Sequence, residues 1–472
     1  MAEGSASAEE ALTGPSSNSS LGTAPEEHGI GARVIAAIAT PAGEGALGIV
    51  RLSGPDVPAI AARFLRGPLR PRQASLALVH DEGKPVERAM AVFFPGPESY
   101  TGEDVLELTA HGSPYLLSRI LELAVKSGAR LAEPGEFTRR AYLNGRMDLA
   151  QAEAVALLIR SRTESSARAA FDQLEGRLSA AVAELRRRIL GALATVEAAL
   201  DHPEGDLPAF EPAAAASALS ALALDARRLA DTHRRGRVAA DGARVSIVGR
   251  PNTGKSSLLN ALLGRDRAIV SDAAGTTRDT LEETADLGGI RAVLVDTAGI
   301  REDSEAGAVE REGMRRARAV LATADLAVVV LDRSALFSEE DRRILIAAAA
   351  GGRPVIVALN KSDLPRRMTA VDGVEISATL GQGVERLADL MRRELSVSAG
   401  SPEGEPLVVS VRHRLALERA AELLDEAASK TAEGELAALH AREALGCLGE
   451  IVGDTAPEEV LREVFARFCI GK

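Results

Sequence analysis

The chain has 472 residues, 46% of them apolar, and its 68 acidic against 56 basic residues give a formal charge of −12. That length is enough for several domains with more than one hydrophobic core. No apolar run approaches the ~18 residues that a membrane span needs. The acidic balance and the 3% aromatic content disfavour a wide nucleic-acid-binding surface. The two cysteines, Cys447 and Cys469, are too few for a disulfide framework, so we expect a cytoplasmic protein.

The first part of the chain divides into an irregular tail and a strand-rich region. Residues 1–30 are rich in Ala, Gly, Ser, Glu and Pro without periodicity, which predicts a disordered tail. This tail lacks an apolar core and contains several Glu, so we expect no signal or transit peptide in it. Strand-like runs and one helix then predict an α+β domain over residues 31–145. The strand-like runs are Val34–Ile38, Ile49–Leu52, Ala89–Phe94 and Val105–Leu108, and the helix is Pro114–Lys126.

Helical periodicity dominates two separated stretches. Apolar residues recur every three or four positions from Phe171 to Leu200, which predicts one long amphipathic helix, and a second is expected from Ala213 to Arg234. The same period returns from Leu415 to Ile451, and Thr455 with Glu458 predicts a capping box before a final helix. We therefore predict one all-α domain in two parts, residues 146–240 and 399–472, split by the insertion of residues 241–398.

The inserted segment alternates short apolar runs with helical stretches, which predicts an α/β domain with a mainly parallel sheet. Its first strand, Val245–Val248, is followed by the phosphate loop Gly249-Arg250-Pro251-Asn252-Thr253-Gly254-Lys255-Ser256 and a helix. That context is the one in which backbone N–H groups cradle phosphates. Lys255 would supply charge at the β and γ phosphates, and the Ser256 hydroxyl would ligate Mg²⁺.

Three further segments predict that the nucleotide is GTP. Asp296-Thr297-Ala298-Gly299 ends a strand, where the Asp can reach Mg²⁺ and the Gly N–H can meet the γ-phosphate. Asn360-Lys361-Ser362-Asp363 follows another strand, and its Asp can accept both N–H groups of guanine. Ser377-Ala378 would back the base, and Thr277 is the candidate switch threonine. Together these motifs resemble the Ras-like translation-factor class of GTPases.

The position that usually orients the attacking water is altered. Ras-type proteins place Gln directly after the Asp-Thr-Ala-Gly segment, and here the residue is Ile300. Either hydrolysis is very slow or other groups substitute. The oxygen acceptors of Asn252 and of residues 271–276 could hold a monovalent cation. The acids that could orient water are Glu302, Asp303, Glu305 and Glu310.

Motifs outside the nucleotide domain carry a more specific resemblance. From Val34 to Lys472 the sequence resembles the MnmE (TrmE) family of tRNA-modification GTPases. The motifs concerned are Ala39-Thr40-Pro41, Gly48-Ile49-Val50-Arg51-Leu52-Ser53-Gly54, Tyr100-Thr101-Gly102-Glu103-Asp104-Val105-Leu106-Glu107, Pro134-Gly135-Glu136-Phe137-Thr138-Arg139-Arg140-Ala141, Leu143-Asn144-Gly145-Arg146-Met147-Asp148-Leu149-Ala150-Gln151-Ala152-Glu153 and Phe468-Cys469-Ile470-Gly471-Lys472.

The resemblance implies a role for each part of the chain. The N-terminal domain would bind tetrahydrofolate, as its 5,10-methylene or 5-formyl form, and mediate homodimerisation. Arg51, Glu107 and Arg146 match the folate-contacting positions, with Lys472 near the same site. Arg146 stands where some members have Lys, and an Arg fork and a Lys point charge are not equivalent contacts. Cys469 matches a terminal cysteine proposed to act in the modification chemistry, whereas mid-helix Cys447 is expected to be a buried structural thiol.

The resemblance also fills in the catalytic site. It implies a K⁺ ion held by Asn252, Ser271, Ala273 and Thr276, and Mg²⁺ held by Ser256 and Thr277. It selects Glu310, within Val309-Glu310-Arg311, as the residue that orients water. The full set of nucleotide contacts that it implies is Asn252, Thr253, Gly254, Lys255, Ser256, Ser257, Ser271, Asp272, Ala273, Ala274, Gly275, Thr276, Thr277, Asp296, Thr297, Ala298, Gly299, Asn360, Lys361, Asp363, Ser377 and Ala378.

The implied reaction needs a partner, the flavoprotein MnmG, which would carry the FAD. The pair would add a carboxymethylaminomethyl or aminomethyl group to carbon 5 of the wobble uridine of certain tRNAs. The partner would hold most of the tRNA, in agreement with the acidic charge of this chain. Two alternatives differ in testable features: a ribosome-assembly GTPase predicts a basic RNA-binding domain, and a folate-binding regulator with a vestigial GTPase predicts damage to Lys255, Asp296 or Asp363. Neither feature is present.

Overall fold

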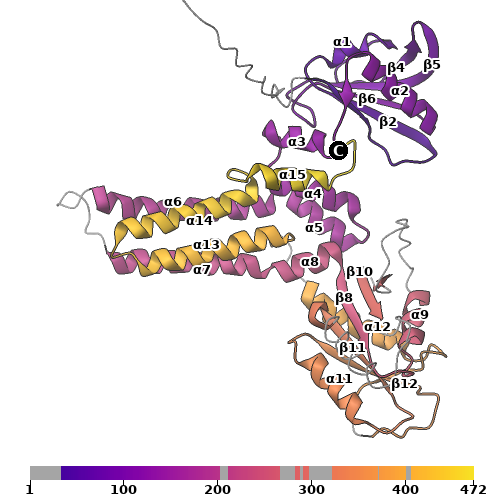
Figure 1. Ribbon diagram of the computed structural model, residues 1–472, viewed down its shortest axis with the longest axis vertical. Coiled ribbons are helices and arrows are strands. Elements are labelled where there is room, and N and C mark those ends of the chain that lie inside the picture. Colours follow the sequence, from indigo (N-terminus) through magenta and orange to yellow (C-terminus); the bar gives the residue numbers. More distant parts are fainter. Residues whose placement is uncertain are drawn as a thin grey trace, which may run out of the picture. The chain divides into compact units, whose positions relative to one another are not determined.

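The computed structural model describes residues 33–201, 211–265, 282–287, 291–296, 321–369, 371–399 and 405–472 (Figure 1). Its contacts group the chain into two compact units. The first unit holds the residues up to Ser99 together with Glu103–Ala132. The second holds Tyr100–Gly102 together with Glu133–Lys472. None of the described helices is both long enough and apolar enough to cross a membrane.

The first unit is a sheet covered by helix α2 (Pro114–Lys126), which coincides with the predicted helix. The described strands are β1 (Ile35–Ile38), β2 (Gly45–Ser53), β3 (Leu65–Arg66), β4 (Ser75–Asp81), β5 (Lys84–Phe94), β6 (Val105–Gly112) and β7 (Arg130–Leu131), and α1 spans Val57–Ala61. They are ordered β3-β4-β5-β6-β2-β1-β7, antiparallel except for β1 and β7. Leu117, Ile120 and Leu123 of α2 join the sheet residues in one core. Leu117 lies directly over Gly48, where a Cβ atom would collide with it.

The helical part of the second unit is built from segments on both sides of the insertion. Helices α6 (Arg177–Asp201) and α7 (Pro212–Asp231) pack with α13 (Val411–Ser429) and α14 (Gly434–Val452), so magenta and yellow helices lie side by side in Figure 1. All four helices contribute to one hydrophobic core. The predicted discontinuous all-α domain is therefore confirmed. The other helices are α3 (Glu136–Leu143), α4 (Leu149–Arg160), α5 (Glu164–Leu174), α8 (His233–Asp241) and α15 (Glu458–Ala466).

Two predicted helices are each divided in two. The stretch from Phe171 to Leu200 breaks after α5, because Gly176 has a φ of +81° and the Gln151 side chain caps the Leu174 carbonyl at 2.9 Å. Phe171 is consequently exposed rather than part of the buried stripe. The helix expected from Ala213 to Arg234 ends at Asp231. Thr232 then separates α7 from α8, and its Oγ1 accepts a hydrogen bond from the Val408 N–H at 3.0 Å.

The predicted capping box before the final helix is wrong. The N-cap of α15 is Pro457, with no side-chain hydrogen bond to the cap. Thr455 Oγ1 instead donates to the Gly446 carbonyl at 2.8 Å, which ties the loop back to α14. A capping box does form at α4, where Asp148 and Gln151 each bond the backbone of the other. The Thr455 hydroxyl is therefore used by a contact with the preceding helix, which the spacing of Thr455 and Glu458 does not reveal.

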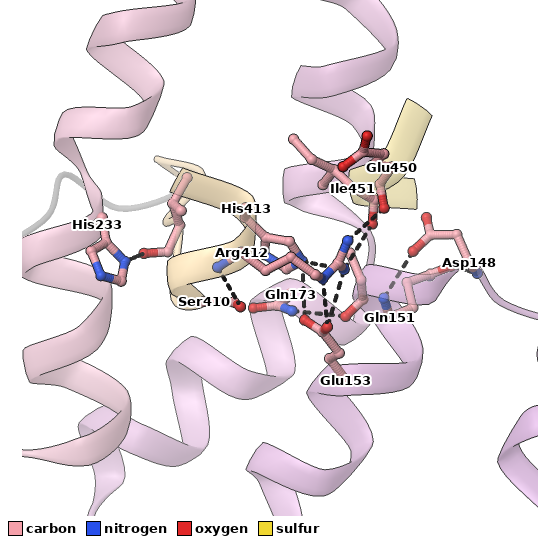
Figure 2. Close-up of polar contacts among 12 residues, drawn as sticks. Asp148, Gln151, Glu153, Gln173, His233, Ser410, Arg412, His413, Glu450 and Ile451 are labelled. Carbon is pink, nitrogen blue, oxygen red and sulfur yellow. Dashed lines mark hydrogen bonds and ion pairs between the residues drawn. The ribbon is translucent and has the colours of Figure 1, made fainter. Parts of the chain in front are cut away.

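A charged cluster, half-buried at Glu153 and Arg412 and buried at His413, joins three helices of the helical domain (Figure 2). Glu153 of α4 accepts from Arg412 Nε at 3.0 Å and lies 3.0 Å from His413 Nε2, both from the start of α13. Arg412 also donates to the carbonyls of Glu450 and Ile451, at the end of α14. Burial raises the pKa of Glu153, but its contacts with His413 and Arg412 outweigh burial and hold that pKa below its ordinary value. We call these three residues the Glu153 cluster.

The inserted domain has an α/β fold with a mainly parallel sheet, as predicted. Its described strands are β8 (Ala243–Val248), β9 (Glu282–Asp286), β10 (Arg291–Asp296), β11 (Leu326–Asp332), β12 (Val355–Asn360) and β13 (Val374–Glu375). They are ordered β13-β12-β11-β8-β10-β9, and only β9 is antiparallel to its neighbour. Helices α9 (Lys255–Arg265), α11 (Glu339–Ala349) and α12 (Val384–Ala399) accompany it. Because the other strands are parallel, their carboxyl ends meet at one edge, where ligands of such sheets bind.

Candidate nucleotide-binding site

The phosphate loop lies between β8 and α9, and its two glycines are required by their surroundings. A Cβ atom on Gly249 would collide with the Val330 carbonyl, and one on Gly254 would collide with Asn360 Nδ2. Gly254 also has a φ of +91°, in the left-handed region. Asn252 shares that region at +62°, which Asn tolerates better than most residues. These constraints shape the tight turn between β8 and α9.

The Lys255 side chain is buried within the phosphate loop. It is only 6% exposed, and its Nζ donates to the Arg250 carbonyl at 2.9 Å. Thr253 Oγ1 donates to the same carbonyl at 2.9 Å. The Arg250 carbonyl therefore fixes the position of the ammonium group that is expected to reach the phosphates.

The expected magnesium ligands begin at the same edge of the sheet. Ser256 is exposed in the first turn of α9. Asp296 ends β10, and its register opposite Ile247 of β8 brings its backbone to that edge. Serine and aspartate oxygens suit Mg²⁺, so the residues present fit this ion.

The base-binding side is joined to the phosphate loop by Asn360. Its Nδ2 donates to the Thr253 carbonyl at 2.8 Å, and its Oδ1 accepts from the Ala378 N–H at 3.0 Å. Asn360 and Ser377 are buried, whereas Asp363 is exposed. The structure therefore brings the expected phosphate-binding and base-binding segments together around one side-chain amide.

Lys361 of the base-binding motif has an acidic partner that sequence reasoning missed. Its Nζ lies 2.6 Å from Oδ2 of Asp332, the last residue of β11. Burial raises the pKa of Asp332, but hydrogen bonds from Lys361 and Ser334 outweigh burial and hold that pKa below its usual value. Lys361 itself has a φ of +65°. The signal that could have found Asp332 is its place at the end of a strand beside the one that leads into Asn360.

Several predicted site residues lie outside the described residues. They are Ser271, Asp272, Ala273, Ala274, Gly275, Thr276, Thr277, Thr297, Ala298, Gly299, Ile300, Glu302, Asp303, Glu305 and Glu310, and the side chain of Asp296. The switch threonine, three of the four expected potassium ligands and the water-orienting acid therefore stay predictions. Asn252, the remaining potassium candidate, is exposed in the loop.

The residues expected to contact folate fall into two groups. In the first unit, Arg51 and Glu107 face each other across β2 and β6, and Arg51 Nε donates to Glu107 Oε1 at 2.9 Å. In the second unit, the Lys472 ammonium lies 5.9 Å from the ring centroid of Tyr100, a cation–π contact. The aliphatic stem of Arg146 passes beside Gly102. Arg146 and Lys472 are thus both adjacent to the short segment Tyr100–Gly102.

The two cysteines differ in environment. Cys469 is exposed and follows a tail anchored by Phe465 and Phe468, whose rings are 5.7 Å apart in a buried cluster. Cys447 is half-buried and packs against the core of the helical domain. Burial, aided by Glu450, raises the pKa of the Cys447 thiol, which disfavours its reactive thiolate. The accessible terminal thiol is therefore the better candidate for chemistry.

Known proteins match the chain across its domains. Residues 34–146 match the family description GTP-binding protein TrmE N-terminus, and residues 149–469 match MnmE helical domain. The tRNA modification GTPase MnmE of Aquifex aeolicus is 43% identical over 450 residues, which is 93% of this chain and 99% of the relative. That of Chloroflexus aurantiacus is 44% identical over 456 residues, with the same two coverages. The chain belongs to the MnmE family of tRNA modification GTPases. As a family member it is a GTP hydrolase that acts in tRNA modification, with a nucleotide-binding G domain inserted in its helical domain.

Among solved structures, the crystal structure of Aquifex aeolicus Era bound to GDP and AlF₄⁻ aligns with 39% of this chain and 70% of that one at 27% identity. The TM-score of that alignment is 0.25.

Proposed function

We propose that this chain is a potassium-stimulated GTPase that works with the flavoprotein MnmG on the wobble uridine of certain tRNAs. Together they add a carboxymethylaminomethyl or aminomethyl group to carbon 5, and the one-carbon unit comes from 5,10-methylene- or 5-formyl-tetrahydrofolate. FAD belongs to the partner. The observation that carries the proposal is the match to family members over 93% of the chain, which includes the domains on both sides of the GTPase.

In this proposal the G domain supplies conformational work and the remaining domains supply the modification chemistry. The phosphate loop and Lys255 hold the triphosphate, Ser256, Thr277 and Asp296 hold Mg²⁺, and Asp363 reads the guanine. Magnesium, when bound, neutralises phosphate charge as the bond to the γ-phosphate breaks. The other residues of the implied contact set line the same nucleotide.

The potassium proposal rests on the residue that follows the Asp-Thr-Ala-Gly segment. Ile300 has no group that can orient water. Asn252, Ser271, the Ala273 carbonyl and Thr276 together would offer oxygen ligands to K⁺, and the exposed Asn252 amide fits that role. The ion would supply positive charge near the transferred phosphoryl group. Glu310 is the acid that we assign to the water.

The folate proposal rests on the match of the chain to the family. Arg51, Glu107, Arg146 and Lys472 would recognise the charged and polar groups of tetrahydrofolate, and Cys469 would act near the one-carbon unit. The domain boundaries proposed here are 31–145 for the folate-binding and dimerisation domain, 146–240 with 399–472 for the helical domain and 241–398 for the G domain. A cytoplasmic homodimer that joins MnmG in a heterotetramer completes the proposal.

The decisive experiment is mass spectrometry of tRNA nucleosides from a strain that lacks this gene. Loss of the carbon-5 groups at the wobble uridine, restored by the wild-type gene, is the expected result. Complementation with Cys469→Ser should restore GTP turnover but not the modification, and Cys447→Ser is the matched control that should restore both. An unchanged nucleoside profile in the deletion strain would contradict the proposed function.

A further inference from the structure

The segment that links β11 to α11, from the last residue of the strand to the first turn of the helix, touches both halves of the nucleotide site. We call residues 332–341 the β11–α11 connector. It contains none of the motifs that predicted the site from the sequence. Its first residues contact the base-binding motif, and its last residue contacts the phosphate loop.

At the base end, Arg333 holds the backbone on both sides of Asp363. Its Nη1 donates to the carbonyl of Ser362 and to the carbonyl of Leu364, each at 3.0 Å. Its own N–H donates to the Asn360 carbonyl at 2.9 Å. The Arg333 side chain is only 15% exposed, and its bond to the Ser362 carbonyl is partly buried, whereas its bond to the Leu364 carbonyl faces solvent. The two carbonyls flank the residue whose carboxylate is expected to read guanine.

Asp332 reinforces the same end. Its Oδ1 accepts from the N–H of Ser334 at 2.9 Å and from the Ser334 hydroxyl at 2.6 Å, while its Oδ2 accepts from Lys361. The two bonds from Ser334 hold the Asp332 carboxylate in the orientation in which it accepts from Lys361. The connector thus bonds Lys361 and the two residues that flank Asp363, Ser362 and Leu364.

At the phosphate end, the anchor is the carboxylate of Asp341. This side chain is fully buried, and its Oδ1 accepts from Arg250 Nε at 2.7 Å. Its Oδ2 accepts from the N–H and hydroxyl of Ser338, in the capping box of α11. The Arg250 carbonyl is the group to which Lys255 donates, so Asp341 fixes the residue that positions the phosphate-binding ammonium.

We propose that the β11–α11 connector is a two-ended positioning element, in which Arg333 sets guanine selectivity through Asp363 and Asp341 sets phosphate affinity through Arg250. The inference rests on GTP occupying the site proposed above. Loss of Arg333 frees the backbone around Asp363 without altering the phosphate loop. Loss of Asp341 frees Arg250 without altering the base-binding motif.

Inosine nucleotides separate the two effects because hypoxanthine lacks the exocyclic amino group that guanine offers to Asp363. The experiment measures dissociation constants of GDP and IDP for the full chain by isothermal titration calorimetry. Arg333→Ala should weaken GDP roughly tenfold and IDP much less, so the preference for GDP shrinks. Arg333→Lys keeps a donor near the carbonyls and should restore part of the preference.

The matched control for the base end is Arg366→Ala. Arg366 lies in the same loop as Asp363. Its side chain bonds the Met368 carbonyl and Glu375, and no bond from it to Ser362 or Leu364 is among those described. It should leave the preference unchanged. If Arg333→Ala keeps the wild-type ratio of the two dissociation constants, Arg333 does not position Asp363 and the inference fails at that end.

Asp341→Ala should weaken GDP and IDP by the same factor, roughly tenfold, with the ratio unchanged. Asp341→Asn keeps the side-chain size, and serves as the second variant if Asp341→Ala unfolds. Ser338→Ala is the control, because it removes the cap hydroxyl but leaves Arg250 paired with Asp341. Wild-type affinity in both Asp341 variants would overturn the phosphate end. Failure of the wild-type chain to bind either nucleotide would instead refute the proposed GTP site.

Discussion

Asn360 donates from Nδ2 to the carbonyl of Thr253 at 2.8 Å, across the carboxyl edge of the sheet. Its Oδ1 accepts from the Ala378 N–H, so one amide supplies both a donor and an acceptor. Asn360→Asp turns the donor into a second acceptor that faces a carbonyl. We expect a loss of about 1–3 kcal/mol in unfolding free energy, and a GDP affinity reduced about tenfold or more. Thermal unfolding and calorimetry would measure these, with exposed Asn260→Asp as a control that should change neither.

Gly254→Ala tests the shape of the phosphate loop. A Cβ atom would collide with Asn360 Nδ2, and the φ of +91° is strained for any residue with a Cβ. We expect destabilisation of about 1–3 kcal/mol and loss of GDP binding. Gly264 lies in α9, the helix that follows the loop, and a Cβ atom added there has nothing within 4 Å, so Gly264→Ala should be neutral or stabilising. Equal behaviour of the two variants in thermal melts and binding would show that the loop tolerates the methyl group.

The Glu153 cluster predicts a pH dependence of stability. Because the folded-state pKa of Glu153 is depressed, its contribution to stability is present above the unfolded value, about 4.3, and is lost as pH falls through the folded pKa. Glu153→Gln should lower the unfolding free energy by about 3 kcal/mol at pH 7 and flatten this acid limb. Chemical denaturation between pH 7 and pH 3 measures both quantities. Exposed Glu422→Gln should give the wild-type curve.

Potassium should stimulate GTP turnover by about tenfold or more over sodium at equal ionic strength. The reason is that Ile300 cannot orient water and Asn252 offers an oxygen ligand to a cation. Steady-state phosphate release in the two salts measures the effect, and Asn252→Ala should abolish the difference between them. Identical turnover in both salts would remove the case for a potassium site.

Glu310→Ala should abolish hydrolysis and preserve GTP binding, because the side chain is assigned to the attacking water rather than to the nucleotide. Single-turnover hydrolysis and GDP calorimetry separate the two effects. Glu302→Ala and Glu305→Ala are matched controls from the same acidic stretch. Survival of hydrolysis in Glu310→Ala, with its loss in one of the controls, would transfer the role to that acid.

The contact between the phosphate loop and the expected base-binding segments was predictable, because each lies at the end of a strand of one parallel sheet. The phosphate loop, Asn360 and Ser377-Ala378 follow apolar strands, so the parallel sheet brings them together as expected. Asp332, Arg333 and Asp341 were missed because their partners lie 29 and 91 positions away in the sequence. Ser338-Glu339-Glu340-Asp341 did carry a local capping signal, but nothing in it points to Arg250.

Helix boundaries were less predictable than helix existence. The apolar stripe from Phe171 to Leu200 continues in register through Gly176, so periodicity alone could not show the break. The break at Thr232 depends on a hydrogen bond from Val408, which follows the insertion. At Gly176 the Gln151 side chain bonds the Leu174 carbonyl, which a continuing helix would have satisfied itself, whereas at Thr232 the side-chain hydroxyl satisfies the N–H of Val408.

The four helices that share one core, α6, α7, α13 and α14, are made at different times during synthesis. A ribosome makes α6 and α7 first, then the whole G domain, and only afterwards the two helices that cover them. The apolar faces of α6 and α7 are therefore without their final partners while the G domain is being made and folded. A chain released before α14 would keep a folded nucleotide-binding domain beside uncovered helices, which are a target for chaperones and proteases. The helical domain can therefore complete its core only after its C-terminal helices have been made.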